Sequence, residues 1–508
     1  MAYLNSYLVA IAASLVLLHI ITIVLHRVFF NPLSRIPGPL LNALSSIPHD
    51  LACVLGKRHK YLTDLHDAYG PIVRVAPTEV SFIDPSIWRD VYGFHPQREE
   101  CMKSDNHARL NGWTGILDAE RADHRRMRRL LSHAFSEQSL RQQEERLKEQ
   151  VDALVEGLKG KCRDGKVVDM CLWLQWTTFD IMGDLAFGGS FGSLAATKTH
   201  PWQQFLLDYI AAGLWTGIAE RWGLKGFADW CAPPSLLRAV QQFHDLCSEK
   251  LMKRVKLGKE RGDFLDHVLQ HDLLTMEQEK GEDTKGLHMQ ELENIAADIA
   301  IAGSETSSTL LTGAIFYLLT NPRVLERVTA EVRTLRSDED ITLVATAKLP
   351  YFVAVLEEGL RIFHPVPASA SRTAVAGGVT VGPYFIPKGS RMWPAHYVAY
   401  RSPLHFARPL EFLPERWLAD KPEEFKEDNA SGIYQPFSFG PRNCIGNNLA
   451  RAEMRIMLAK LLWHFDLEKP ELSTEDEKTW DGWMDRLKVY FLWEKPPLMV
   501  KLKMRSSV

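Results

Sequence analysis

The feature that most limits how this chain can fold is an apolar run near its start. Residues 7–25, YLVAIAASLVLLHIITIVL, carry no formal charge, and a helix that spans a bilayer needs about 20 such residues. A cleaved signal peptide would have a basic n-region, a shorter apolar core and a small-residue cleavage site, which this run lacks. The run therefore predicts a membrane anchor in residues 1–30, with its transmembrane helix over about residues 7–25.

Basic residues follow this run, and apart from the amino terminus no positive charge precedes it. His26, Arg27 and Arg35 come soon after it, so the positive-inside tendency places the rest of the chain in the cytosol. The motif IPGP comes next, and its two prolines cannot continue a helix. We expect residues 31–40 to form a proline-rich hinge and residues 41–508 to form a single globular domain.

Composition and charge exclude some classes of protein. Sixty basic and 63 acidic side chains leave a formal net charge of −3, so no overall field attracts nucleic acid. Hydrophobic residues make up 46% of the 508 residues, enough for a large core. The seven cysteines are scattered and form no CxxC motif. This pattern argues against a disulfide framework and a structural zinc site, and it favours a reducing compartment.

Periodic patterns in the body predict helices with short strands between them. Residues 70–84, GPIVRVAPTEVSFID, alternate as in a hairpin with its turn near Pro-Thr-Glu. Residues 172–187 have helical spacing, and residues 374–392 return to short strands and turns. The predicted fold class is mainly α with small β-sheets.

Cys444 stands in an unusual loop, FSFGPRNCIG, directly before a strong amphipathic helical pattern. A thiol at a helix N-terminus gains thiolate character from the helix dipole and the free amide groups. The loop holds no second cysteine and no histidine, so it offers a metal only one protein ligand. Haem requires only one axial protein ligand. From residue type alone, a buried free thiol is the alternative.

A short polar segment, AGSETS at residues 302–307, interrupts a long apolar helical run. Buried polar groups cost free energy unless they are paired. The Thr306 hydroxyl can bond the Ala302 carbonyl and loosen the helix. Gly303 leaves one position of the helix without a side chain, and Glu305 sets an acid beside the alcohol. A polar patch that faces another helix is the alternative.

Two further motifs have charged residues at helical spacing. EGLR pairs Glu358 with Arg361 and is followed later by FLPERW, which contains Arg416. DHRRMRRLL places His124 and Arg128 one helical turn apart. Taken alone, EGLR would be a surface ion pair that contributes little to stability, and DHRRMRRLL would be a basic helix face exposed to solvent.

Together these motifs resemble the cytochrome P-450 family. Its haem-binding loop, FxxGxRxCxG, is matched here by Phe437, Gly440, Arg442, Cys444 and Gly446, and the other motifs follow in the family's order and spacing. The resemblance covers the chain from the anchor to the C-terminus. It implies one large P-450 domain of the microsomal type behind one transmembrane helix. In its overall sequence pattern, including NPLSRIPGP, the chain is most similar to fungal secondary-metabolism enzymes such as trichothecene-pathway hydroxylases.

The resemblance also implies residue roles. Thr306 and Glu305 would be catalytic, the alcohol orienting oxygen and water and the acid helping to deliver protons. Gly303 would leave room for dioxygen. Glu358, Arg361 and Arg416 would form a buried triad that supports the haem loop. Haem b would have Cys444 as its axial iron ligand, and the residues that bind it would be Cys444, His124, Arg128, Arg372, Arg442, Gly303 and Phe437.

The implied activity is that of a monooxygenase that inserts one oxygen atom from O2 into an apolar small organic substrate, by hydroxylation, epoxidation or further oxidation. Electrons would come from NADPH through NADPH-cytochrome P-450 reductase, with cytochrome b5 as a further partner. Arg125, Arg126 and Arg129 would face outward and dock an acidic redox partner. The chain would sit in the endoplasmic reticulum membrane as a single-pass protein that contacts lipid and no nucleic acid. Two alternatives are a haem-thiolate isomerase or dehydratase that needs neither dioxygen nor reductase, and a haem-binding sensor or scaffold.

For the substrate, the sequence leaves terpenoid, polyketide, fatty-acid-like and alkaloid classes open. By resemblance the pocket would be lined by residues 106–116, 206–222 and 366–371 and by the AGSETS helix. Trp113 and Ala302 are candidate wall residues. Asp298 lies one turn before Ala302 and would meet a polar or cationic group of the substrate, or else pair with a neighbour as a buried structural residue.

Overall fold

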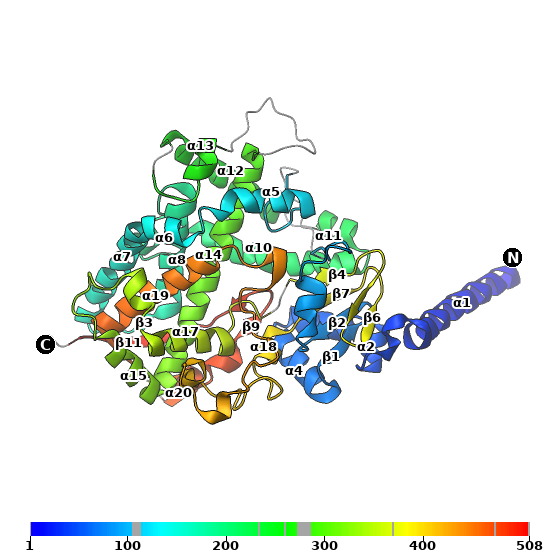
Figure 1. Cartoon of the computed structure of the whole chain (residues 1–508). Helices are drawn as coiled ribbons and strands as arrows, with labels where there is room; N and C mark the ends of the chain where they lie inside the picture. The colour runs from blue at the N-terminus through cyan, green and yellow to red at the C-terminus, as the bar shows by residue number, and fades with distance from the viewer. Residues whose placement is uncertain are drawn as a thin grey trace.

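The computed structural model describes residues 2–103, 113–231, 234–258, 261–271, 286–367, 370–471 and 474–505. Helix α1 (Ala2–Leu25) projects from the body of the molecule (Figure 1). Together with the π-helical turn η1 (His26–Phe30), it contains a segment, Ala10–Phe30, that is long and apolar enough to cross a membrane. None of this segment is buried. The predicted N-terminal apolar helix is thus present and is compatible with a single-pass anchor.

The proline-rich segment after the anchor is fixed to the body. It contains the short turn η2 (Pro32–Arg35). Leu33 within this turn and Ile36 directly after it are buried. The Arg74 amide donates to the Pro37 carbonyl at 2.8 Å. At Gly38 a Cβ would lie 2.4 Å from the Arg74 carbonyl oxygen, so this close approach requires glycine.

The N-terminal part of the body is built around a small mixed sheet. The predicted hairpin is confirmed as β1 (Ile72–Ala76) and β2 (Glu79–Phe82), which pair antiparallel. β2 then pairs in parallel with β7 (Arg391–Pro394), and β4 (Arg372–Thr373) completes the order β1-β2-β7-β4. Both faces of β1 and β2 are buried, including the polar side chains of Arg74, Glu79 and Ser81. The nearby elements are α2 (Leu40–Leu44), α3 (Ile47–Val54), α4 (Arg58–Tyr69), η3 (Trp88–Tyr92), α18 (His396–Ala399) and the hairpin β5 (Val379–Val381) with β6 (Tyr384–Ile386).

Helices form the larger part of the molecule, around the long helix α14 (Met289–Thr320). α8 (Met170–Phe187) packs along it, and every residue of α8 except Leu172 is buried, as expected for a helix that is apolar on all sides. The other helices are α5 (Arg121–Ser132), α6 (Glu137–Gln142), α7 (Glu144–Arg163), α9 (Ser193–Ala196), α10 (Pro201–Arg221), α11 (Lys225–Cys231), α12 (Pro234–Lys256), α13 (Asp266–His271), α15 (Pro322–Val332), α16 (Leu343–Thr346), α17 (Pro350–Ile362), α19 (Asn447–His464) and α20 (Thr474–Asp481).

The C-terminal strands close the helical part. β11 (Met499–Met504) lies between β3 (Val168–Asp169) and β8 (Phe465–Glu468), and β9 (Lys488–Val489) pairs with β10 (Trp493–Glu494). Short turns fill the remaining segments: η4 (Pro414–Trp417), η5 (Glu423–Phe425), η6 (Gly440–Arg442) and η7 (Trp483–Arg486). The prediction of a mainly α fold with small sheets is confirmed.

Candidate functional site

Cys444 lies in a tight loop at the N-terminal end of α19. The loop turns at Gly440, whose φ is 75° and whose Cβ, if present, would lie 2.0 Å from the Tyr92 carbonyl oxygen. The Cys444 amide donates to the Phe437 carbonyl at 2.8 Å and closes the loop. The Phe437 ring lies under the Arg451 guanidinium, 5.0 Å away. Although most of α19 is buried, the Cys444 side chain is exposed, so its sulfur is accessible to a ligand.

Thr306 and Ala302 form an accessible patch on the otherwise buried helix α14. The Thr306 hydroxyl donates to the Ala302 carbonyl at 2.7 Å, which is the bond that the sequence predicts. Ala302 is exposed and Thr306 half-buried, whereas Ser304, Glu305 and the turns that follow are buried. This patch can meet a small molecule without unpacking the helix.

The neighbouring Glu305 carboxylate has other partners. It is 3% exposed, accepts a hydrogen bond from Gln175 of α8 at 2.9 Å, and forms an ion pair with Lys495. The Thr309 hydroxyl also donates to it at 3.2 Å. Lys495 and Gln175 were missed from the sequence because no local motif identifies them. Glu305 therefore belongs to a buried ion-pair network rather than to a pair with Thr306.

Gly303 has a packing role that the sequence did not suggest. A Cβ on Gly303 would lie 2.2 Å from the Met182 sulfur of α8. The expectation that this glycine makes room for dioxygen is corrected here, since its missing side chain makes room for the neighbouring helix.

His124, Arg372 and Arg442 come together in a buried cluster of positive charge, and Lys103 joins them. Burial, with the charges of Arg442, Lys103, Arg128 and Arg372, lowers the pKa of His124 to about 3. Burial and the same arginines, Arg372 and Arg442, lower the pKa of Lys103 to about 8. Arg442 pairs with Glu100 at 2.5 Å, but Arg372 Nη1 is buried with no hydrogen-bond partner among the described residues. Four cations, Lys103, Arg128, Arg372 and Arg442, thus face three carboxylates, Glu100 and, on Lys103, Asp118 and Asp298, which leaves a small surplus of positive charge. Lys103 is a member that the sequence motifs did not reveal.

Arg128 contacts the cysteine loop directly. It donates to the Asn443 carbonyl at 2.6 Å and also to the Asn443 side chain, one residue before Cys444. Its contacts in the structure position the loop. The prediction that it also contacts the cofactor stays a prediction.

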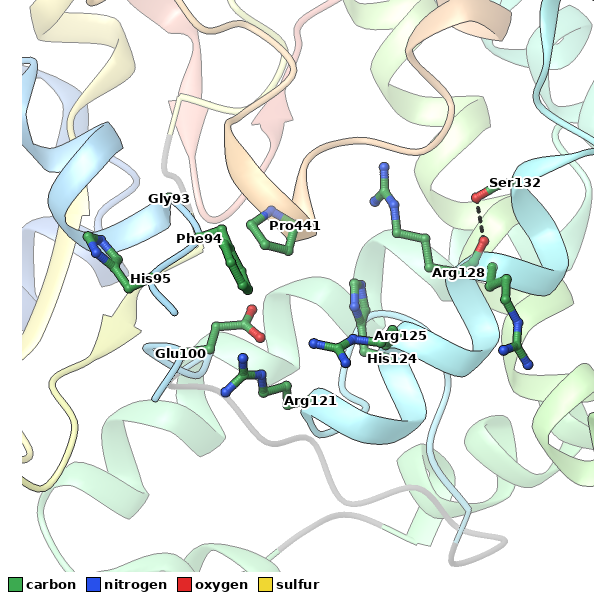
Figure 2. Close-up of a pocket in the computed structure, with 11 residues that line it drawn as sticks. Gly93, Phe94, His95, Glu100, Arg121, His124, Arg125, Arg128, Ser132 and Pro441 are labelled. Atoms are coloured by element: carbon green, nitrogen blue, oxygen red, sulfur yellow. Dashed lines mark hydrogen bonds between the residues drawn. The ribbon is translucent and has the colours of Figure 1, made fainter. Parts of the chain in front are cut away.

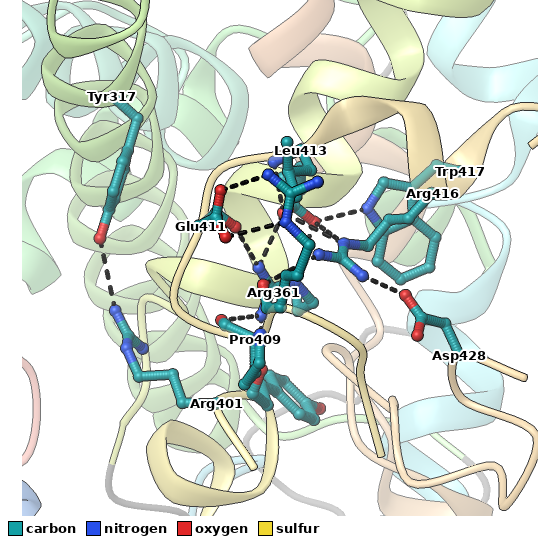
Figure 3. A network of polar contacts seen from close by, with 12 residues as sticks. Tyr317, Arg361, Arg401, Pro409, Glu411, Leu413, Arg416, Trp417 and Asp428 are labelled. Carbon is teal, nitrogen blue, oxygen red and sulfur yellow. Dashed lines mark hydrogen bonds and ion pairs between the residues drawn. The ribbon is translucent and has the colours of Figure 1, made fainter. Parts of the chain in front are cut away.

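The predicted triad is assembled as expected. Arg361 makes two hydrogen bonds to Glu358, at 2.8 and 2.7 Å, and Arg416 lies 3.1 Å from the same carboxylate. Arg361 also donates to the carbonyls of Tyr400, Pro409 and Glu411, which ties α17 to the segment before η4 (Figure 3).

Two members of this network were not predicted. The Trp417 indole donates to Glu358 at 2.9 Å, and Asp428 pairs with Arg416. A phenylalanine at position 417 would lack this donor. Two carboxylates therefore balance two guanidinium groups.

Helix α5 corrects one expectation. Arg126 does not face outward: it is 8% exposed and pairs with Glu291 of α14 at 2.7 Å and with Asp123 at 2.8 Å. Arg125 and Arg129 are exposed, as predicted. Figure 2 shows Arg121, Arg125 and Arg128 around a hollow of about 460 Å³. It is also lined by Gly93, Phe94, His95, Glu100, His124, Arg129, Ser132 and Pro441.

The candidate substrate residues have mixed outcomes. Asp298 is 2% exposed and accepts the Leu117 amide at 3.2 Å, which favours its structural alternative. The Trp113 carbonyl accepts from Asn294 at 2.9 Å, and its ring lies 4.9 Å from the His288 ring. Of the predicted pocket segments, residues 106–112 and 368–369 and the side chains of residues 206–212 lie outside the described parts.

Comparison with known proteins decides what kind of site this is. The family model for cytochrome P-450 matches residues 38–501. The chain belongs to the cytochrome P-450 family. Averantin hydroxylase of Dothistroma septosporum is 40% identical over 496 residues, covering 96% of this chain and 90% of the relative. Cytochrome P-450 monooxygenase astJ of Aspergillus oryzae is 36% identical (95% and 94% covered), and trichothecene C-15 hydroxylase of Fusarium sporotrichioides is 37% identical (97% and 98% covered).

As a P-450, the chain is an oxidoreductase that incorporates oxygen, uses haem b and receives electrons from NAD(P)H through a reductase. Its substrate is a small molecule, and its relatives are fungal monooxygenases of secondary metabolism. These names support the monooxygenase interpretation over the isomerase or dehydratase alternative.

The residues of this P-450 fit haem. The exposed Cys444 side chain suits an iron ligand. The lowering of its pKa that the helix N-terminus predicts is not found, because desolvation by the surrounding protein raises the pKa of this thiol. The surplus of buried positive charge, with the unpartnered Arg372 Nη1, suits the two carboxylates of haem b. Cys444 would hold the iron, and Arg372, Arg442, His124 and Lys103 would hold the carboxylates.

Proposed function

We propose that this chain is a membrane-anchored P-450 that oxidises an apolar small molecule in fungal secondary metabolism, in a pathway of the terpenoid or polyketide kind. The observation that carries the proposal is similarity over nearly the whole chain to enzymes named averantin hydroxylase and trichothecene C-15 hydroxylase. The accessible Cys444, in the loop before α19, and Thr306, on α14, support it.

In the proposed mechanism, Cys444 binds haem iron, and the thiolate-ligated haem supplies the activation of dioxygen. Thr306 is the proton-handling group nearest the substrate, because its Oγ1 is accessible and already carries a hydrogen bond to the Ala302 carbonyl. Rotation of this hydroxyl away from Ala302 would let Oγ1 donate a proton or hold a water. The Ala302 carbonyl would then be free to accept from that water.

Glu305 can supply protons only when its carboxylate leaves Lys495. The pair is almost fully buried, with exposures of 4% for the Glu305 side chain and 6% for Lys495. Separating it inside the protein would leave uncompensated charge. We therefore propose that Glu305 supplies protons to Thr306 only after the segment following β10, which carries Lys495, has moved and broken the ion pair.

The hollow of about 460 Å³ on α5 is the proposed docking surface for NADPH-cytochrome P-450 reductase, with cytochrome b5 as a second ligand. The exposed Arg125 and Arg129 border it, next to Pro441 of the cysteine loop. An acidic partner would be steered to this face, and its electrons would arrive close to Cys444. Arg125→Glu should raise the KM for reductase without changing the carbon monoxide spectrum.

The anchor and an adjacent apolar surface are proposed to contact the endoplasmic reticulum membrane, with the body in the cytosol. α2 contacts η1, and α3 contacts α10, which leads into α11. Exposed apolar side chains follow these elements: Leu40, Leu41, Ile47, Leu51, Leu224, Phe227 and Trp230. Quenching of Trp230 by brominated lipids in reconstituted vesicles would test this contact, and Trp230→Ser should remove the quenched component.

The experiment that tests the function is coexpression with a reductase in a fungal host, with metabolites compared against Cys444→Ala. A product that needs NADPH, dioxygen and Cys444 is expected. Reduced protein with carbon monoxide should show the red-shifted Soret band of a thiolate-ligated haem. A haem-loaded, folded protein without that band would contradict the assignment of Cys444.

A further inference from the structure

A buried acid, Glu453, lies on the helix that follows Cys444. It is 0% exposed and stands roughly 9 Å along α19 from Asn447. Its Oε2 is 2.7 Å from the Ser307 hydroxyl of α14, and its Oε1 is buried without a hydrogen-bond partner among the described residues. Ser307 is the residue directly after Thr306.

No charged side chain compensates a negative charge at this position. Burial raises the pKa of Glu453 to about 8, and the Ser307 hydrogen bond is the single opposing influence. Arg455 of α19 has a buried Nε without a hydrogen-bond partner among the described residues, but it does not act on Glu453, and three other charged side chains nearby have partners of their own. Lys460 pairs with Asp152 of α7 and with Asp338, Arg451 pairs with Glu357 of α17, and Glu305 of α14 pairs with Lys495. Glu453 is therefore a neutral carboxylic acid near pH 7.

Thr306 is flanked by two anchored residues. Successive residues of a helix are rotated by about 100°, so residues 305, 306 and 307 face three directions. Glu305 is held by Gln175 of α8 and by Lys495, and Ser307 is held by Glu453 of α19. Contacts on both sides of Thr306 thus set the rotation of α14 about its axis, and hence where the threonine hydroxyl lies.

We propose that Glu453 is a positioning residue that joins the helix following Cys444 to the helix carrying Thr306, and so sets the separation between the sulfur and the threonine hydroxyl. The effect of Glu453 on catalysis rests on the proposed function. The structural part of the proposal is one neutral hydrogen bond between the helix that follows the iron ligand and the helix that carries the proton-handling alcohol.

The first test uses stability and needs no substrate. The folded protein keeps the Glu453 proton up to about pH 8, whereas the unfolded chain loses it near pH 4.5. The stabilisation from this proton is therefore complete below pH 4.5 and lost as the pH rises through about 8. As the pH rises through this range, the stability of wild-type protein should fall relative to that of Glu453→Gln. Above about pH 8 the difference between the two should stay constant. A thermal-midpoint difference that does not change with pH would overturn the neutral acid.

The second test measures coupling, as product formed per NADPH consumed. Ser307→Ala and Glu453→Leu each remove the bond between α14 and α19, and a displaced hydroxyl should lower coupling roughly tenfold. Glu453→Gln can still bond Ser307 and should recover most of the coupling. Met457→Leu, a buried apolar change on the same helix, is the matched control and should behave as wild type.

Folding and function are kept separate in these tests. If Glu453→Leu does not fold, Ser307→Ala decides the question, because it leaves the acid in place. Full coupling in a folded Ser307→Ala variant with a normal carbon monoxide spectrum would overturn the proposal. If wild-type protein oxidised nothing, the proposed function would fail, while the stability comparison would still decide whether Glu453 is a neutral link.

Discussion

Two buried groups of charged residues in this P-450 differ in how their charge is balanced. Around Glu358, the carboxylates of Glu358 and Asp428 meet the guanidinium groups of Arg361 and Arg416. Around His124, the cations Lys103, Arg128, Arg372 and Arg442 meet three described carboxylates: Glu100, which pairs with Arg442, and Asp118 and Asp298, which act on Lys103. In each group the three central side chains are almost fully buried: Glu358, Arg361 and Arg416 in one, and His124, Arg372 and Arg442 in the other. The balanced group stabilises the protein by itself, whereas the group with surplus positive charge needs an anionic ligand.

The pKa shifts have the matching signs. Burial alone would raise the pKa of Glu358, but Arg361 and Arg416 outweigh it and hold the pKa below its ordinary value. At His124, burial and neighbouring cations both lower the pKa. Removing a charge from the group around Glu358 should therefore destabilise the apoprotein, whereas removing a cation from the group around His124 should not.

The largest effect is expected for Glu358→Gln. It leaves Arg361 and Arg416 as buried charges without their carboxylate, at a cost of about 3–5 kcal/mol. Apoprotein and holoprotein should both lose stability, and little haem-loaded protein should form. Glu411→Gln, which alters an exposed pair with Arg408, is the control and should barely move the thermal midpoint. Equal effects of the two substitutions would contradict the importance of the buried cluster.

Arg372→Gln should separate haem binding from folding. Loss of one charge-assisted hydrogen bond to a haem carboxylate should speed haem dissociation by about 10- to 100-fold. The apoprotein should be no less stable than wild type, since a buried cation without a full set of partners is removed. Haem transfer to apomyoglobin and apoprotein melting measure the two quantities. Arg401→Gln, outside the cluster and stacked on Tyr397, should leave haem loss unchanged.

His124 predicts an acid dependence that haem should weaken. The unfolded chain binds a proton at His124 below about pH 6.5, but the folded apoprotein binds it only near pH 3. Apoprotein stability is therefore full above pH 6.5 and falls by up to about 1.4 kcal/mol per pH unit as the pH decreases. Bound carboxylates would raise the pKa of His124, so the holoprotein should show a shallower slope. Urea unfolding of both forms from pH 5 to 7 tests this, with His124→Gln as the variant that lacks this contribution.

The smallest effect is expected for Trp417→Phe. It removes the indole donor to Glu358 while keeping an aromatic ring, for a loss of about 1 kcal/mol. Combined with Glu358→Gln, it should cost less than the sum of the two changes, because both act on one carboxylate. Strict additivity in urea unfolding would show that the indole stabilises the fold through packing alone.

Much of the site could be read from local patterns. The bond from Thr306 to Ala302 and the contact of Glu358 with Arg361 lie within one helix, where spacing specifies neighbours. Lys103 was missed because a lone lysine in a loop has no spacing signal. Arg126 was misplaced because helical periodicity identifies faces but not which face packs on another helix.

The sequence by itself determined the N-terminal apolar helix, the helical fold class and the cysteine loop, since each depends on residues close together in the chain. Tertiary structure alone decided which charges are paired, because the partners are distant in sequence. Lys495 meets Glu305 across 190 positions, and Glu453 meets Ser307 across 146. In a low-dielectric interior such pairing decides whether a side chain is an ion, a neutral acid or a ligand-binding cation. Packing therefore determined the chemistry of residues whose positions the sequence had already marked.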